Sequence, residues 1–265
     1  MNRLIKRKYL SVRGTDENNH RKHTHINHAE WIWILSGHGT FLIGDRALEI
    51  RPGRLFVIDS ETLHCSSPAD NEPYVRDKIV FYKDALENLM MLCNMSFKEI
   101  ADNCFDTGED LHPLMQRLAQ STEPIRDTTA VCELLEIIGH SEPEAPSDPT
   151  MGVILETVAA DPSKDYSVAY FSRQTHLSPY HLCRQFKQKT GFGLMEYVTV
   201  KRMDHAKKLL ADEKLTVTEV STACGYDNLS SFCRRFQAIV GVSPSAFRRQ
   251  ARQTSEKDRK RNLFG

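Results

Sequence analysis

Several features are scarce in this sequence, and each scarcity excludes a class of protein. No uncharged apolar run approaches the ~18 residues that a bilayer-spanning helix needs, so no membrane segment is expected. The first ten residues are basic and have no apolar core, which argues against a secretory signal. Neither a glycine-rich phosphate loop nor the Gly-x-Ser-x-Gly turn of many hydrolases occurs. These absences favour a cytoplasmic protein that is not an enzyme.

The seven cysteines also lack the pattern of a disulfide scaffold. Their number is odd, and no two of them form a Cys-x-x-Cys pair. Secreted disulfide-rich domains have an even number of cysteines at close spacing. The pattern therefore indicates reduced thiols in a cytoplasm, most of them acting as small hydrophobic groups in the core.

The zero net charge conceals a difference between the two halves of the chain. Residues 1–150 hold 16 Lys and Arg against 24 Asp and Glu, whereas residues 151–265 hold 19 against 11. This asymmetry indicates that the second half meets a polyanion such as nucleic acid, although a basic half can also be an ordinary solvated surface.

A chain of 265 residues favours two domains, and the segment Ser141–Pro149 is the clearest boundary. It contains three prolines and no large apolar residue, as interdomain linkers do. Before it, β-branched and aromatic runs between turn signals predict short strands at 31–35, 40–43, 48–50, 55–58 and 79–82. Such strands form a small β-barrel or sandwich, and apolar residues three and four apart predict helical segments at 84–103 and 110–139.

After the linker, apolar periodicity and capping residues predict helices only. The seven expected helices are 152–160, 168–175, 179–190, 194–211, 217–224, 229–240 and 244–252. The fold class is therefore α+β with two domains, the second of them all-α. The predicted divisions are a sensor domain at 1–140, a linker at 141–150, a helical domain at 151–253 and a charged tail at 254–265.

The helical half contains an internal repeat. Leu182–Phe186 is followed after four residues by Gly191, and fifty residues later Phe232–Phe236 is followed after four residues by Gly241. Each copy predicts a short helix, a tight turn and a second helix, which is the arrangement of a helix-turn-helix unit.

Helical spacing separates an inner face from an outer face in the second helix of each unit. Leu182 and Phe186 are expected to pack inward in the first unit, as are Phe232, Phe236 and Ile239 in the second. The side chains left on the outer faces, which we predict to contact DNA, are Tyr180, Cys183, Arg184, Lys187, Ser230, Cys233, Arg234 and Gln237. A lone arginine on a helix is usually solvated or salt-bridged. The recurrence of one at mid-helix in both units favours contact with guanine O6 and N7.

The helix at 194–211 joins the two units and is about 27 Å long at 1.5 Å per residue. A rigid helix of that length can hold two recognition helices about one DNA turn apart on one side of the duplex. The residues expected to face the two units are Leu194, Tyr197, Val198, Met203, Ala206 and Leu210. The basic residues expected at the surface or toward phosphates are Lys201, Arg202, Lys207 and Lys208.

The segments Gly225–Phe236 and Gly241–Arg248 resemble the signature of the AraC/XylS family of bacterial transcription regulators, and Arg202–Ala206 resembles its linker helix. The resemblance covers about residues 151–250. It implies a DNA-binding domain with two helix-turn-helix units and places the outer-face residues named above at base-reading positions. The sequence departs from the family at His176, where glycine is usual, and at Gln237-Ala238, which replace a basic pair.

The N-terminal strands resemble the cupin-like effector-binding and dimerisation domain common in that family. His23, His25 and Glu30 look like the first cupin motif, and Arg51–Gly53 with His64 look like the second, although the Pro-x-Gly before that histidine is absent. By this resemblance the helices after the barrel supply a homodimer contact. Its candidate residues are Leu89, Met90, Leu92 and Met95.

Two alternatives stay open for the sensor. His23 and His25 share one face of a strand and, with Glu30 and His64, could hold a divalent metal. The same side chains could instead bind a sugar-like effector by hydrogen bonds, with no cofactor, and Trp33 could stack on a sugar ring or belong to the core. The effector-binding candidates are thus His23, His25, Glu30, Trp33 and His64.

The sequence as a whole predicts a ligand-responsive transcription regulator that binds double-stranded promoter DNA. Its expected partners are a small-molecule effector, possibly a carbohydrate, a second copy of the chain, and RNA polymerase if the protein is an activator. The alternative is a metal-dependent cupin enzyme that carries a DNA-binding module, and its only support is the set of three histidines and Glu30.

Overall fold

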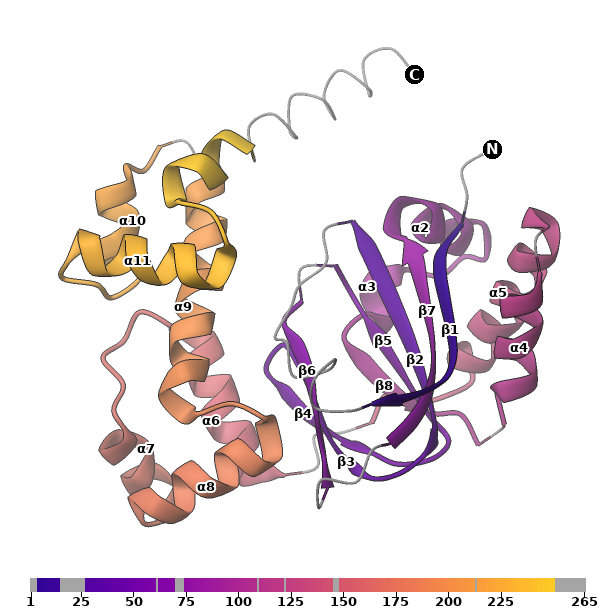
Figure 1. Ribbon diagram of the computed structural model, residues 1–265, viewed down its shortest axis with the longest axis horizontal. Coiled ribbons are helices and arrows are strands. Elements are labelled where there is room, and N and C mark those ends of the chain that lie inside the picture. The colour runs from indigo at the N-terminus through magenta and orange to yellow at the C-terminus, as the bar shows by residue number, and fades with distance from the viewer. Residues whose placement is uncertain are drawn as a thin grey trace. The chain divides into compact units, whose positions relative to one another are not determined.

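The computed structural model describes residues 4–14, 27–60, 62–69, 74–108, 110–121, 123–144, 148–212 and 214–250. The described chain divides mainly at Val153–Ile154 into a β-rich unit and a helical unit (Figure 1). The predicted α+β class with an all-α second half is therefore confirmed.

Two antiparallel sheets form the β-rich unit. The five-stranded sheet has the order β1 (Ile5–Gly14), β7 (Tyr74–Tyr82), β2 (His28–Ser36), β5 (Arg54–Ile58) and β8 (Asn103–Asp106). The three-stranded sheet has the order β4 (Arg46–Ile50), β3 (Gly39–Ile43) and β6 (His64–Pro68).

The alternation of side chains along β2 divides the unit into an inner and an outer core. Ile32 and Ile34 belong to the inner core, together with residues of β3, β4 and β5. Trp31 and Trp33 point to the opposite face and belong to the outer core, which the helices cover. Those helices are α2 (Lys83–Leu92), α3 (Phe97–Ile100), α4 (His112–Gln120) and α5 (Pro124–Gly139) (Figure 1).

Three strands were not expected from the sequence: β1, β6 and β8. β1 is an edge strand rich in Lys and Arg, so it lacks the apolar alternation by which strands are recognised. β6 is mostly polar, and β8 is a strand of four residues that begins at residue 103, where the predicted helical segment ends. Pairing with neighbouring strands, rather than local propensity, determines these three segments.

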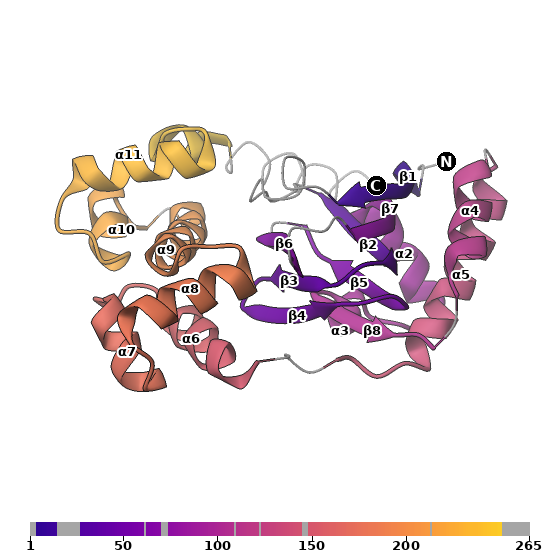
Figure 2. The same cartoon turned by 60° about the horizontal axis from the view of Figure 1, so that its bottom comes forward.

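The helical unit follows the predicted pattern closely. Its helices are α6 (Pro149–Ala160), α7 (Val168–Thr175), α8 (Pro179–Thr190), α9 (Leu194–Ala211), α10 (Val217–Ala223), α11 (Leu229–Val240) and a further helical stretch at 244–250. Figure 2 shows α9 between the pair α7–α8 and the pair α10–α11. The six residues of α9 that were expected to face the two units are all buried, so that prediction is confirmed.

Candidate DNA-binding surface and sensor pocket

The sequence specifies the two helix-turn-helix units locally through caps and turns. The Ser167 side chain accepts a hydrogen bond from the Tyr170 amide at the start of α7, and Thr216 and Glu219 form a reciprocal capping box at the start of α10. α7 ends at His176, whose φ of 54° is left-handed. This conformation lies where the resemblance to the family expects glycine, and a residue with a side chain adopts it less readily.

Each second helix has the inner face that its spacing predicts, with one correction. Leu182, Phe186, Phe232 and Phe236 are fully buried. Ile239, however, is 43% exposed, so the expectation that it packs inward is wrong. The buried stripe of α11 continues from Phe232 and Phe236 to the partly buried residue 240, at steps of four, and this direction leaves residue 239 outside.

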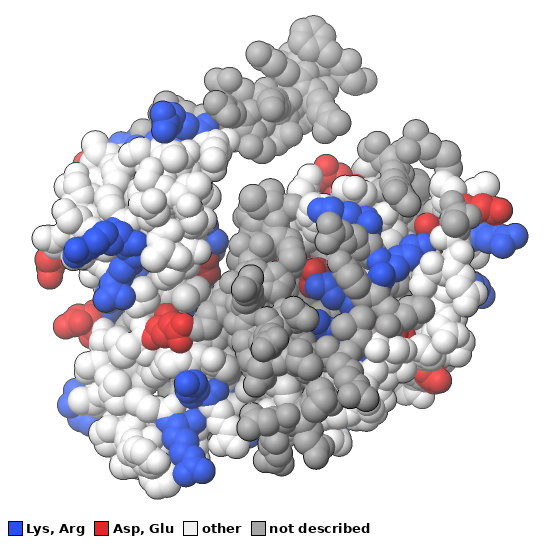
Figure 3. All heavy atoms as spheres, viewed as in Figure 1, with Lys and Arg blue, Asp and Glu red and all other residues white. Residues whose placement is uncertain are grey.

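The eight residues predicted to contact DNA all lie on the outer faces of α8 and α11. Six of them are exposed: Tyr180, Arg184, Lys187, Ser230, Arg234 and Gln237. Cys183 and Cys233 are half-buried beside them. On the face seen in Figure 3, basic side chains are distributed over the helical unit, with acidic ones between them, rather than gathered in one patch.

Arg202 of α9, which was expected at the surface or toward phosphates, is half-buried and forms a clamp within the helical unit. Its Nε donates to the Pro162 carbonyl at 3.0 Å and one Nη donates to the Lys164 carbonyl at 2.8 Å. Its guanidinium also lies over the Tyr226 ring, 5.5 Å from the centroid. The side chain thus joins the loop before α7 to the turn after α10, and the helical pattern of the sequence gave no sign of this loop contact.

Gly225 lies at the same joint and has no room for a side chain. Its φ is +75°, and an added Cβ would lie 2.2 Å from the Ser163 carbonyl oxygen. One Nη of Arg202 donates to the Gly225 carbonyl at 3.4 Å. The turn of the second unit is therefore packed directly against the loop that leads into the first.

A buried polar cluster lies on the inner face of the β-rich unit. Glu30 is 1% exposed, and one of its carboxylate oxygens lies 2.6 Å from Lys78 Nζ and 3.6 Å from His64 Nε2. The Thr62 carbonyl lies 2.9 Å from His64 Nδ1, and the Phe41 ring stacks near the imidazole. β2, β6 and β7 thus bring together two predicted effector residues, Glu30 and His64, and Lys78, which the sequence did not single out.

A second group of polar side chains continues this cluster. Arg76 donates to the Tyr74 hydroxyl at 2.6 Å, and that hydroxyl donates to Ser66 Oγ at 3.1 Å. All three residues are buried, and burial raises the pKa of Tyr74, which keeps its hydroxyl protonated. Hydroxyl and charged groups inside an apolar barrel can recognise a small polar molecule.

Of the other predicted sensor residues, only Trp33 lies in the described part of the chain, and it is not in this cluster. Trp33 is buried in the outer core, on the face of β2 opposite to Glu30. His23 and His25 lie outside the described residues. Among the residues that are described, no group of three His, Cys, Asp or Glu could hold a metal ion. The set predicted for a metal therefore stays a prediction, because two of its four members are not described.

Comparison with known proteins decides the family. Residues 9–135 match the AraC-like ligand binding domain, and residues 171–250 match a helix-turn-helix domain. The chain belongs to the AraC/XylS family of transcription regulators. A ligand-binding domain and a DNA-binding domain in one chain make it a ligand-responsive transcription regulator.

Individual relatives span most of this regulator. The HTH-type transcriptional activator RhaR of Klebsiella pneumoniae is 24% identical over 255 residues, which cover 87% of this chain and 88% of the relative. The activator RhaR of Escherichia coli is 23% identical over 251 residues, which cover 86% of this chain and 86% of the relative. Among solved structures, ToxT from Vibrio cholerae is 13% identical, covering 94% of this chain and 95% of its own, with a TM-score of 0.39. The DNA-binding domain of AdpA with a target DNA is 23% identical, covering 41% and 96%, with a TM-score of 0.38.

No helix in the described part of the regulator is long and apolar enough to cross a membrane. This agrees with the absence of a long apolar run in the sequence.

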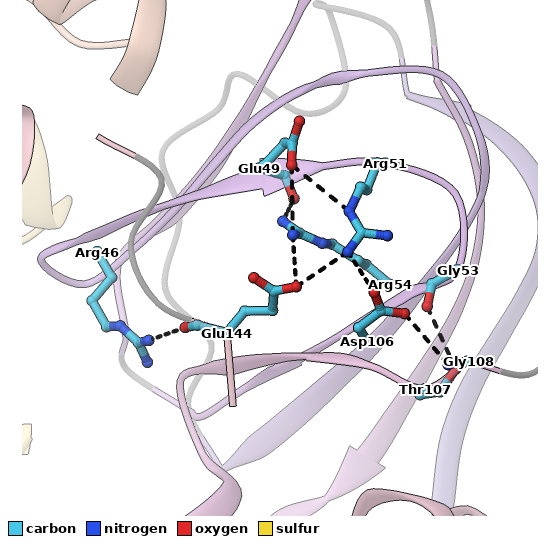
Figure 4. Close-up of polar contacts among 9 residues, drawn as sticks. All are labelled: Arg46, Glu49, Arg51, Gly53, Arg54, Asp106, Thr107, Gly108 and Glu144. Atoms are coloured by element: carbon cyan, nitrogen blue, oxygen red, sulfur yellow. Dashed lines mark hydrogen bonds and ion pairs between the residues drawn. The ribbon is translucent and has the colours of Figure 1, made fainter. Parts of the chain in front are cut away.

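The beginning of the predicted linker is attached to the regulator's sensor domain. Pro143 forms a β-bridge with Phe105 of β8, and the Glu144 amide donates to the Cys104 carbonyl at 2.8 Å. The Glu144 carboxylate lies 2.8 Å from an Nη atom of Arg54, and other contacts reach two further arginines (Figure 4). Arg51 lies 3.2 Å from the Glu144 carboxylate, and Arg46 donates a hydrogen bond to the Glu144 carbonyl at 2.6 Å.

This cluster attaches the start of the linker to the sensor domain through a nearly buried arginine, and not only through exposed ion pairs. The Arg54 side chain is only 6% exposed, and it also donates to the Glu49 carbonyl at 2.7 Å. Arg51 pairs with Asp106, and this pairing holds the pKa of the Asp106 carboxyl below its usual range. Since Arg54 is nearly buried, removing the Glu144 charge leaves the guanidinium with only the Glu49 carboxylate, 3.5 Å away, which costs more than breaking an exposed pair.

We therefore expect Glu144→Gln to detach the linker from the sensor. The melting temperature of the sensor should fall by several degrees, corresponding to about 1–2 kcal/mol, and limited proteolysis within 141–149 should become several-fold faster. Glu142→Gln, which changes an exposed carboxylate of the same segment, is the matched control and should have no effect. Equal proteolysis rates in the two variants would show that the anchor does not restrain the linker.

Proposed function

We propose that this regulator binds a carbohydrate or another polyhydroxylated small molecule inside its β-barrel and controls transcription through α8 and α11. The observation that carries the effector assignment is the buried cluster of Glu30, Lys78 and His64 on the inner face of the barrel. A carboxylate accepts hydrogen bonds from two hydroxyls, while an ammonium and an imidazole supply donors. The nearby Phe41 ring offers an apolar surface for the CH face of a sugar.

We infer that the DNA interface consists of the eight outer-face residues of α8 and α11. In this proposal Arg184 and Arg234 read base edges in adjacent major grooves, and the remaining residues contact flanking bases or phosphates. The exposure of these side chains on two equivalent helices supports the proposal. In the same proposal the half-buried thiols of Cys183 and Cys233 contact apolar base edges beside each arginine.

We also propose a homodimer that activates transcription by contact with RNA polymerase, in line with relatives that are named transcriptional activators. Of the dimer candidates, Met90 is fully buried within the outer core, so it is not a contact residue. Leu92 is 86% exposed at the end of α2, next to Met91 at 74%, and these two side chains are the better candidates. The same proposal includes the predicted domain divisions at residues 140 and 150 and the charged tail at 254–265. The tail lies outside the described residues.

A binding role is proposed for the sensor rather than catalysis. The rival, a metal-dependent cupin enzyme, needs His23 and His25 as ligands in addition to the described residues. Elemental analysis of the purified protein separates the two, because the enzyme requires stoichiometric metal and turnover, whereas the proposed sensor requires neither.

We expect Glu30→Gln to weaken effector binding by about 10- to 150-fold, because a charge-assisted hydrogen bond to a ligand contributes about 1.5–3 kcal/mol. The measurement is a thermal-shift titration of the full chain with the sugar that a carbohydrate screen selects; that sugar at 100 times its dissociation constant should stabilise the wild-type protein by about 2.7 kcal/mol. Glu136→Gln, which changes an exposed carboxylate on α5, is the control and should titrate like the wild type. Unchanged affinity in Glu30→Gln, or no response to any sugar, would contradict the effector assignment.

A further inference from the structure

Two thiols that are far apart in the sequence lie in contact on the helical layer of the sensor. Cys93 Sγ and Cys132 Sγ are 3.8 Å apart, although the residues are separated by 39 positions. Cys93 ends α2, and Cys132 lies in the middle of α5. Neither residue belongs to the proposed effector cluster or to the recognition helices.

The backbone around this pair is well fixed. The Cys93 amide donates to the carbonyls of Leu89 and Met90, and the Met95 amide donates back to Met90. The Met95 methyl group lies close to Gly139 of α5, so the turn that follows Cys93 rests against the helix that carries Cys132. The two sulfur atoms, 3.8 Å apart, need to approach each other by about 2 Å to form a disulfide.

We propose that Cys93 and Cys132 form a reversible thiol-oxidation site, which peroxides convert to an intramolecular disulfide. Cys93 is exposed and Cys132 is half-buried, so an oxidant reaches Cys93 first. Burial and the neighbouring Cys93 thiol also raise the pKa of the Cys132 thiol. The difference in exposure assigns the attacking role to Cys93 and the resolving role to Cys132.

The chemistry balances with hydrogen peroxide as the oxidant. The Cys93 thiolate attacks one peroxide oxygen, so that an S–O bond forms, the O–O bond breaks and hydroxide leaves. The Cys132 sulfur then attacks the Cys93 sulfenic acid, the S–S bond forms and water leaves with the thiol proton. Two thiols are oxidised, one peroxide is reduced to two waters, and a dithiol reductant reverses the change by exchange.

Other cysteines are less suited to this reaction. Cys104 and Cys224 are buried, and burial raises the pKa of Cys104 to about 12 and that of Cys224 to about 11. Cys183 and Cys233 are half-buried on separate recognition helices. A disulfide between Cys93 and Cys132 ties the end of α2 to α5 and closes a loop that contains β8 and α4, which stabilises the sensor.

The test treats the reduced full chain with a few equivalents of hydrogen peroxide, blocks the remaining thiols and digests the protein with trypsin without reduction. The expected product is a linked pair of peptides, 84–98 and 127–164, with a mass two hydrogens below their sum. Titratable thiols should fall from seven to five, and dithiothreitol should restore them. The melting temperature of the sensor should rise by roughly 5–10 °C on oxidation.

Matched variants make the result decisive. Cys132→Ser should abolish the linked peptide and leave Cys93 as a trappable sulfenic acid, whereas Cys183→Ser should leave the linked peptide unchanged. Oxidation of Cys93 to a sulfinic acid in the wild-type protein without the link would overturn the proposal. So would a disulfide between the Cys93 residues of two chains, seen as a dimer on a non-reducing gel.

Discussion

Replacing Gly225 with alanine is expected to lower the stability of the DNA-binding half by roughly 3–5 kcal/mol. A left-handed φ of +75° strains any side chain, and the new methyl group would overlap the Ser163 carbonyl oxygen, which is backbone and cannot rotate away. The loop before α7 or the turn after α10 must therefore move. Because the Arg202 clamp joins the same two segments, DNA binding should fall together with stability.

Substitutions at two other glycines distinguish the cost of backbone strain from the cost of steric overlap. Gly241 has a φ of +87° but open space around an added Cβ, so Gly241→Ala should cost only about 1 kcal/mol. Gly152 lies in α6 with no atom within 4 Å of its added Cβ, so Gly152→Ala should be neutral or stabilising by up to about 1 kcal/mol. Thermal melts of the three variants should follow this order. Equal losses for Gly225→Ala and Gly241→Ala would show that the joint between the loop and the turn is not tight.

The second large effect is expected at the recognition helices. Arg184→Ala and Arg234→Ala should each weaken binding to a specific site by about 1–3 kcal/mol, or roughly 5- to 150-fold, because a bidentate contact to guanine is lost. Each change should also relax base preference at its own part of the site and leave the melting temperature unchanged, since both side chains are exposed. The measurement is fluorescence anisotropy with the specific site and with single-base variants of it.

Arg235→Ala is the matched control on the same helix. Arg235 is also exposed, but it is one position further along α11 and so turned by about 100° from Arg234. Its loss should weaken binding to all sequences alike, and by less than tenfold. If Arg235→Ala and Arg234→Ala relaxed base preference equally, the assignment of the outer face of α11 would be wrong.

Much of the helical half could be predicted because its determinants are local. The bounds of α7, α8, α9 and α11 follow from caps, prolines and apolar periodicity, and all four match the sequence-based expectations. The inner faces of α8 and α11 follow from spacing alone, except at Ile239 near the end of its helix. The repeat then identified the equivalent outer faces without knowledge of the tertiary structure.

What could not be predicted depends on contacts between distant segments. The polar or charged strands β1, β6 and β8 exist because neighbouring strands complete their hydrogen bonds. Lys78 contacts Glu30 across paired strands, and Arg202 contacts a loop some forty residues away. In the sequence Glu144 is one charged residue of a predicted linker. Only the structure shows that it pairs with Arg54, ninety residues earlier in the chain. Spacing within a single element contains no information about any of these pairs.

The most direct test of the account is a selection of binding sites from random-sequence DNA with the full-length regulator. Two helix-turn-helix units held by α9 predict sites with two short preferred segments, their centres about 10–11 base pairs apart on one face of the duplex. Arg184→Ala should weaken the base preference of one segment only, and Arg234→Ala should weaken that of the other segment only. A single uninterrupted segment, or two substitutions that affect the same base pairs, would contradict the claim that α8 and α11 read neighbouring major grooves.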